Sequence, residues 1–256
     1  MDTHPNIKRP AWWAYAKHCF VATAVLCGAA FAPTAEAVAT FSSNASVAIT
    51  ASVVDVQGQV VSAPAGLEVT ADASIFVIGT TLTGTATGDA TSTLGSSAWD
   101  GVSGFDLLAQ PLTIAAAASG SASAPPTSTA AAWSYNNFSV YVSYVETALA
   151  DPVTVLLDLV INRAVAVVTD APGETASAAS FVSLITDDGE TTYSEPGTTT
   201  VRYSIGIGDG AFFAVTGEVD ANGSAAAAAA PEPGTAFLIV AGLAGLGALR
   251  RKKMVA

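Results

Sequence analysis

Carboxylates are the main groups in the central part of this chain that could do chemistry. The densest group is Asp187-Asp188-Gly189-Glu190, which places three acids within four residues. Hard oxygen ligands that lie close together can hold Ca²⁺, so Asp187, Asp188 and Glu190 are weak candidate metal ligands. The spacing is not that of an EF-hand, however, and Asp-Gly is a strong hairpin-turn signal. We therefore predict a turn here, and no metal or other cofactor.

The residue types that the central part lacks exclude several mechanisms. Both cysteines and both histidines lie within the first 27 residues, and every lysine lies near one end of the chain. A Ser-His-Asp triad, a Cys-His pair, a Schiff-base lysine and a zinc site built on His or Cys are therefore excluded for residues 38–230. A pair of carboxylates, as in glycoside hydrolases, is the enzymatic alternative that is left. Because no spacing selects such a pair, we predict that the protein is not an enzyme.

The charge of the central part limits its partners. Between residues 38 and 230 the only basic side chains are Arg163 and Arg202, which face 18 Asp and Glu, so the formal charge is near −16. Such a surface repels phosphate backbones, and we expect no nucleic acid as a partner. Metal cations or neutral glycans suit it better. No disulfide can form in this part, so its stability must come from a packed core.

Four aromatic residues and one arginine are candidates for ligand contacts. Trp99, Trp133, Tyr135 and Tyr141 would suit a platform on which sugar rings stack, but we expect core packing for most of them. Trp99 and Trp133 lie near predicted loops and are the better candidates. Arg163 interrupts the apolar phase of its segment, which predicts a bulge or an ion pair with a carboxylate rather than a ligand contact.

The periodicity of the central part predicts strands. Apolar residues recur with period two, and Gly, Asp and Pro separate the segments. Long amphipathic helices, which a parallel α/β sheet would need, are not found, so the pattern predicts an all-β fold and favours an antiparallel β-sandwich. The Gly- and Thr-rich stretch 79–97 is expected to be a hairpin or a long loop. We expect strands over 45–56, 67–78, 138–149, 153–168, 179–186, 198–207 and 211–220.

Turn residues predict how some of these strands are connected and where the domain ends. Ala150-Asp151-Pro152 predicts a hairpin between the strands on either side of it. Gly208-Asp209-Gly210 is expected to join the last two strands. We place the sandwich domain at 38–224 and interpret the polyalanine run 225–230 as a linker, although alanine also has a high helix propensity.

The N-terminus has the organisation of a secretory signal peptide, which we place at residues 1–37. Basic residues precede an apolar run over 19–32, and Ala35-Glu36-Ala37 follows with the A-x-A spacing of a cleavage site. Cleavage is expected after Ala37, with Ala32 as the alternative. The apolar run is short for the roughly 30 Å of a bilayer core. An uncleaved N-terminal anchor is the other interpretation.

The C-terminus combines three features in a fixed order. Pro231-Glu232-Pro233 is extended, because each proline disfavours helical geometry in the residue before it. The uncharged segment 235–249 follows and would reach about 22 Å as a transmembrane helix, which is short for a bilayer. A basic cluster then stops transfer and keeps the chain end in the cytoplasm; it consists of Arg250, Arg251, Lys252 and Lys253.

This tail resembles the PEP-CTERM sorting signal of Gram-negative bacteria over residues 231–253. Pro231, Glu232 and Pro233 match its motif residue by residue. The resemblance implies processing by an exosortase, a membrane-embedded cysteine transpeptidase, after export through the secretion translocon and a transient stage in the inner membrane. The strand layout before the tail is similar to domains that often precede such signals. An ordinary tail anchor with an incidental Pro-Glu-Pro is the alternative.

The resemblance implies an exported structural protein of the cell surface or extracellular matrix, associated with biofilm and exopolysaccharide. The alternative function is a glycan- or calcium-binding β-sandwich module, or a carboxylate-based glycan hydrolase, with the same sorting signal. Aromatic side chains exposed in one cleft, or two carboxylates facing each other about 5–10 Å apart, would favour this alternative. Scattered acids and buried aromatics would favour the structural role.

Overall fold

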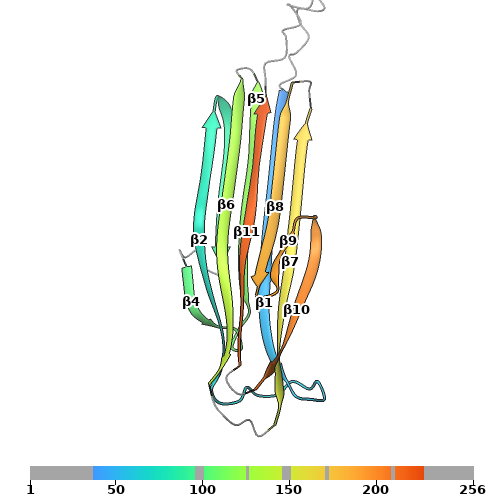
Figure 1. Cartoon of the computed structure of the whole chain (residues 1–256). Coiled ribbons are helices and arrows are strands. Elements are labelled where there is room, and N and C mark those ends of the chain that lie inside the picture. The colour runs from blue at the N-terminus through green and yellow to red at the C-terminus, as the bar shows by residue number, and fades with distance from the viewer. Residues whose placement is uncertain are drawn as a thin grey trace, which may run out of the picture. The chain divides into compact units, whose positions relative to one another are not determined.

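The computed structural model describes residues 37–95, 101–124, 127–145, 151–170, 173–208 and 211–227. These residues belong to one structural unit, called the body here. The predicted PEP motif, apolar segment, basic cluster and all of the signal peptide except Ala37 lie outside them. The body consists of the strands β1 (Ala37–Val54), β2 (Leu67–Thr83), β3 (Thr85–Leu94), β4 (Gly101–Asp106), β5 (Leu112–Ala124), β6 (Ser128–Tyr144), β7 (Val153–Thr169), β8 (Thr175–Thr186), β9 (Gly189–Tyr193), β10 (Gly197–Ile207) and β11 (Phe212–Ala227) (Figure 1).

The strands form two antiparallel sheets that pack face to face. Sheet A has the order β10-β7-β1-β5-β3, and sheet B has the order β4-β2-β6-β11-β8-β9. Side chains from both sheets form one hydrophobic core between them. No helix occurs among the described residues. The predicted all-β, antiparallel sandwich is therefore confirmed for the body.

Consecutive strands change sheet at almost every connection. Only β8 and β9 are neighbours both in the chain and in a sheet. The predicted hairpin around Asp151-Pro152 is therefore wrong, since β6 lies in sheet B and β7 in sheet A. The described part of the stretch 79–97, up to Gly95, is neither a hairpin nor a long loop, because β2 and β3 run through it and separate at Gly84 into different sheets. Alternating apolar residues show that a strand buries one face. Strands of both sheets bury one face, so the alternation does not show to which sheet a strand belongs.

Several strands are longer than the predicted segments. β1 begins at Ala37 rather than at residue 45, and β6 begins at Ser128 rather than at residue 138. β11 continues to Ala227, so the first half of the predicted linker 225–230 belongs to a strand. The added segments bury alanine and serine at every second position, for example Ala39, Ala130 and Ala225. Small residues carry little hydrophobic signal, which is why the pattern missed these strand ends.

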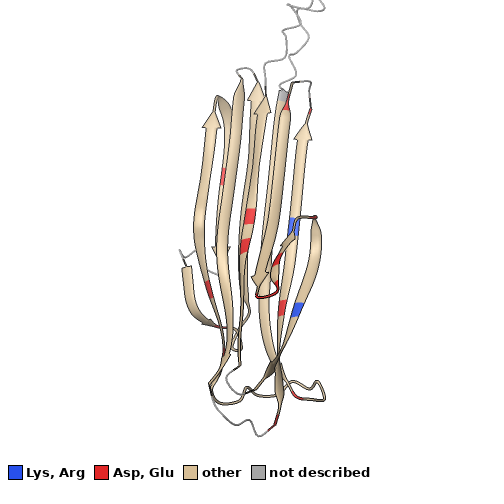
Figure 2. Ribbon diagram, viewed as in Figure 1, with Lys and Arg blue, Asp and Glu red and all other residues tan. Residues whose placement is uncertain are grey.

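The core changes in composition along the strands. One half packs large aliphatic side chains such as Ile49, Leu159 and Val140. The other half packs alanine, serine and glycine, and Phe41 is its large exception. A Cβ atom at Gly120 would lie 2.5 Å from the Phe41 ring, so this glycine makes room for the ring. Charged residues are sparse along much of the strands, as the colours of the ribbon in Figure 2 show.

Buried polar side chains tie the two sheets together. Asn136 of β6 donates a hydrogen bond from Nδ2 to the carbonyl oxygen of Ala115 in sheet A, at 3.0 Å, and accepts one from Ser92 of β3. Ser43 of β1 donates to the carbonyl oxygen of Asn222 in sheet B at 2.9 Å. Buried polar groups need such partners, so these bonds favour one alignment of the sheets.

The two arginines of the body differ in their surroundings. Arg202 of β10 lies opposite Asp158 of β7 and forms two hydrogen bonds with its carboxylate, at 2.5 and 2.6 Å. Arg163 occupies a buried position of β7, is 6% exposed, and its Nε and Nη1 atoms have no hydrogen-bond partner among the described residues.

The pairing of β7 with β1 and β10 continues without a register shift through Arg163, opposite Ala45 and Gly197. The predicted bulge is therefore wrong, and the predicted ion pair is not found within the described part of the chain. The small neighbours leave space in which the aliphatic part of the arginine can occupy an apolar position.

Candidate functional site

The outer face of sheet B carries a row of aromatic and polar side chains along β6. Every second residue of this central strand is half-buried and points away from the core. Core packing is therefore wrong for Tyr135 and Tyr141, because the residues beside them, such as Asn136 and Val140, take the buried phase. Trp133, one of the two better candidates for a ligand contact, also points outward. Trp99 lies outside the described residues. We call the row the outward row of β6; its members are Trp133, Tyr135, Asn137, Ser139 and Tyr141.

The neighbouring strand β2 leaves space for the Trp133 indole. Gly79 pairs directly with Trp133, and a Cβ atom at Gly79 would lie 2.5 Å from the indole ring. The indole therefore lies over bare backbone, where any larger residue would displace it. This contact fixes the position of a large ring on the outer surface of the sheet.

A register shift in β2 adds another aromatic ring to this face. Ile75 pairs with Asn136 and Val77 pairs with Tyr135, so Phe76 is the extra residue between them. Such bulges redirect a side chain. The Phe76 ring meets the Tyr135 ring edge-on at a centroid distance of 5.4 Å, and Phe76 is 67% exposed. Two aromatic rings therefore project together from the middle of the face.

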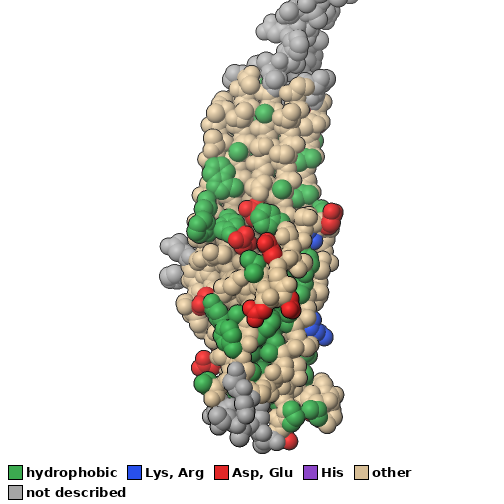
Figure 3. All heavy atoms as spheres, viewed as in Figure 1, with side chains coloured by type: hydrophobic (Ala, Val, Ile, Leu, Met, Phe, Trp, Pro, Cys, Tyr) green, Lys and Arg blue, Asp and Glu red, His purple; other side chains and the backbone are tan. Residues whose placement is uncertain are grey.

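Two carboxylates of β11 lie beside these rings. Asp220 pairs with Tyr135, and Glu218 pairs with Asn137. Burial raises the pKa of the Tyr135 phenol, and its hydrogen bond to Glu218 and the charges of Glu218 and Asp220 raise it further. Figure 3 shows hydrophobic and acidic side chains gathered side by side on this face.

The pKa of the Asp220 carboxyl is also shifted. Burial raises its pKa and the charge of Glu218 adds to this effect, while a hydrogen bond from Nδ2 of Asn222, at 2.5 Å, acts in the opposite direction. The negative charge at the centre of this face is therefore held in a partly desolvated environment.

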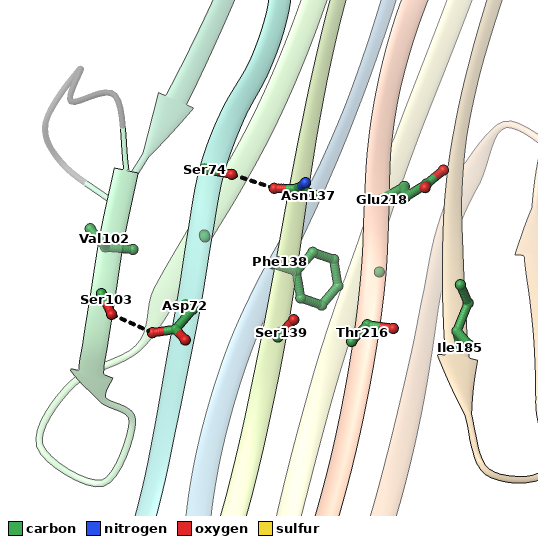
Figure 4. A pocket seen from close by; sticks show the side chains of 12 residues that line it. Asp72, Ser74, Val102, Ser103, Asn137, Phe138, Ser139, Ile185, Thr216 and Glu218 are labelled. Atoms are coloured by element: carbon green, nitrogen blue, oxygen red, sulfur yellow. Dashed lines mark hydrogen bonds between the residues drawn. The ribbon is translucent and has the colours of Figure 1, made fainter.

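A groove of about 400 Å³ crosses the same face next to Tyr135. Val102 of β4 and Ile185 of β8 stand at its two sides (Figure 4). Ser74 of β2 donates a hydrogen bond to the side-chain oxygen of Asn137 on the neighbouring strand β6. The remaining lining residues are Asp72, Ala73, Ser103, Phe138, Ser139, Thr216, Gly217 and Glu218.

The two carboxylates of the groove turn away from each other. Asp72 accepts hydrogen bonds from Ser103 Oγ at 2.9 Å and from the backbone N–H of Gly104 at 2.7 Å, towards β4. Glu218 points towards β8 in Figure 4. Their strands lie two strand spacings apart, about 10 Å. This arrangement differs from the two facing carboxylates of a glycoside hydrolase.

The acidic group at 187–190 forms the turn that the sequence predicts. Thr186 of β8 pairs with Gly189 of β9, so Asp187 and Asp188 form a two-residue connection, and Gly189 has a φ of 125°. Glu190 accepts a hydrogen bond from Ser183 Oγ at 2.7 Å. Within the described residues no three His, Cys, Asp or Glu side chains are grouped so that they could hold a metal ion.

Most of this face cannot be predicted from the sequence. Trp133 and Tyr135 are candidates on sequence grounds, but no pattern points to Phe76, Glu218 or Asp220. The alternation within 211–220 places Glu218 and Asp220 on one face, but their position beside Tyr135 depends on the pairing of β11 with β6. That pairing joins segments far apart in the chain and leaves no local signal.

No protein-family model, no curated protein and no solved structure matches this chain. The class of the protein is defined by its fold and its site: it is an all-strand, two-sheet sandwich with aromatic rings and carboxylates on one outer face. None of the described residues forms a helix that could span a bilayer. The predicted segment 235–249 lies outside them.

Proposed function

We propose that this chain is an exported structural protein of the cell surface or extracellular matrix, delivered by a tail that an exosortase processes. The observation that carries the proposal is the order of features at the C-terminus. Pro231-Glu232-Pro233, the uncharged segment 235–249 and the basic cluster 250–253 follow one another, and a signal-peptide pattern stands at the other end of the chain. In this proposal the inner membrane holds the protein only until the tail is processed.

The body supports a non-catalytic role outside the cell. It is strongly acidic and contains no cysteine, histidine or lysine. Its strands carry many threonine and serine side chains on their outer faces, which suits contact with a hydrated exopolysaccharide matrix. The carboxylates of its groove are turned apart rather than towards a common substrate atom.

The test is the intact mass and the location of the protein produced in a bacterium that has an exosortase. The expected mature protein lacks residues 1–37 and the tail and is found at the cell surface or outside the cell. Glu232→Gln, and separately the replacement of the basic cluster by glutamine, should leave a longer protein in the inner membrane. Glu68→Gln, on an exposed position of β2, is the matched control and should be processed normally.

A protein that keeps its tail in the inner membrane, and is indifferent to both changes, would contradict the proposal. The chain would then be an ordinary tail-anchored protein. Loss of residues 1–37 without loss of the tail would support export but not processing by an exosortase.

A further inference from the structure

The outward row of β6 is long and regular. Alternate residues of a strand lie about 6.8 Å apart, so Trp133 and Tyr141 lie about 27 Å apart along the face. Aromatic pairs stand on both sides of the groove, because Tyr135 meets Phe76 at one end and Tyr141 meets Phe212 at a centroid distance of 6.5 Å at the other. An extended polymer lying along β6 would therefore meet rings, then polar groups, then rings again.

The chemistry of the row matches a sugar polymer. Aromatic side chains offer a flat apolar face and, in Trp and Tyr, a polar edge, which suits the apolar faces and hydroxyl rims of saccharide rings. Phe76 is 67% exposed and Phe212 is 69% exposed, so both rings are accessible on the body. Trp133 is held in place by its contact with Gly79. Rings fixed in this way lose little freedom on binding.

The groove between the aromatic pairs supplies hydrogen-bonding groups. Three neighbouring strands contribute in register, since Asp72, Ser139 and Thr216 form one line across the sheet. Ser74, Asn137 and Glu218 form the next line. Hydroxyl and amide groups both donate and accept hydrogen bonds, and carboxylates accept them. Sugar hydroxyls need both kinds of partner.

The charges select the class of polymer. Asp72 and Glu218 are the charged residues that line the groove, whereas both arginines of the body belong to strands of sheet A. An anionic polymer such as a polyuronate or a nucleic acid would be repelled. A cationic ligand would be attracted by the carboxylates, but it would not need the hydroxyl and amide groups of the groove as hydrogen-bond partners.

We infer that the outer face of sheet B binds a neutral polysaccharide along β6, with Trp133 and Tyr135 stacking on sugar rings and the groove around Asn137 binding their hydroxyls. This inference goes beyond the proposed function and does not depend on how the tail is processed. Binding by a body that is retained in the membrane would leave it intact.

The experiment titrates the full-length chain, kept in detergent, with three soluble probes by calorimetry. The probes are a neutral β-glucan oligosaccharide mixture, a polyuronate and polylysine. The neutral mixture should bind, and Trp133→Ala and Tyr135→Ala should each weaken the binding roughly tenfold. Asn137→Ala should weaken it as well. Asn162→Ala is the matched control, because Asn162 also accepts a hydrogen bond from a side-chain hydroxyl of the neighbouring strand, but in sheet A.

A second variant tests the inference if the removal of an aromatic ring, in Trp133→Ala or Tyr135→Ala, unfolds the protein. Ser139→Phe fills the groove from a half-exposed position and should abolish binding while the melting temperature stays close to that of the wild type. Three results would overturn the inference: no binding of the neutral probe to folded wild type at millimolar sugar, equal binding by all variants, or binding of polylysine alone.

Discussion

Phe41 shows at the residue scale how glycines shape this sandwich. Its ring lies in the small-residue half of the core, between Gly120 of sheet A and Gly223 of sheet B. A Cβ atom at Gly223 would overlap the Phe41 ring and would lie 2.8 Å from the carbonyl oxygen of Ser177. Both glycines are therefore required by close approach rather than by an unusual backbone angle.

We predict that Gly223→Ala destabilises the body by about 1–3 kcal/mol, because it overpacks a filled site. The free energy of unfolding in urea measures the effect. Gly206→Ala is the control, since a Cβ atom there meets nothing within 4 Å, and its effect should stay within about 0.5 kcal/mol. Equal effects of the two substitutions would show that the Phe41 ring does not occupy this space.

The Asp220 carboxyl provides a prediction about pH. Its pKa in the folded state is raised by burial and by the charge of Glu218, above the unfolded value of about 3.9. It therefore stabilises the fold below about pH 4, and this contribution is lost as the pH rises through the folded pKa. Asp220→Asn should raise the melting temperature at pH 7, and the gain should vanish as the pH falls towards 4.

Asp158→Asn is the matched control of opposite sign. The hydrogen bond and charge of Arg202 lower the pKa of Asp158, so its contribution is present above the unfolded pKa and is lost as the pH falls through the folded value. This variant should therefore lower the melting temperature at pH 7 and have no effect at low pH. If both variants changed the melting temperature in the same direction at pH 7, the assignment of the Asp220 shift would be wrong.

At the scale of elements, β11 is the clearest departure from the predicted layout. It lies between β6 and β8 in sheet B and includes Ala225, Ala226 and Ala227. Ala225 is 2% exposed and Ala227 is fully buried, whereas Ala226 faces outward and is half-buried. The alanine tract is therefore a close-packed strand end over these positions, not a spacer.

We predict that Ala225→Leu destabilises the body by about 1–3 kcal/mol, because the two sheets have no room for the larger side chain. Ala226→Leu adds the same atoms to the outer face and should change the stability by about 0.5 kcal/mol or less. Urea denaturation of both variants measures the difference. A linker at these positions would tolerate both substitutions equally.

Local patterns were sufficient for the strands that carry large side chains. Val155, Leu157 and Leu159 are buried on one phase of β7, as their alternation predicts. The Asp187-Asp188 turn is also local and was predicted. The pattern predicts the wrong face for Tyr135, because the polar residues Ser134 and Asn136 take the buried phase. Asn136 is stable there only through its bonds to Ser92 and Ala115, which lie far away in the sequence.

At the scale of the whole body, charge is distributed unevenly between the two sheets. Arg163 and Arg202 lie on the adjacent strands β7 and β10 of sheet A, while Asp72, Glu218 and Asp220 belong to sheet B. Only Arg202 forms an ion pair within the described residues.

The groove could not be predicted from the sequence. Its lining comes from five strands that are separated along the chain, and local patterns do not show which strands become neighbours in a sheet.

The change of sheet at nearly every connection has a consequence for the time at which this body can form. Neighbouring strands in the chain rarely pair, so early local hairpins are almost absent, and folding that depends on distant pairings is slow. The last strand, β11, fills the gap between β6 and β8. Until β11 has paired, β6 and β8 each have one unpaired edge, and such an edge can pair with a wrong strand. If the chain is exported from its N-terminus, as we propose, the sandwich is complete only after the residues of β11 have left the secretion pore.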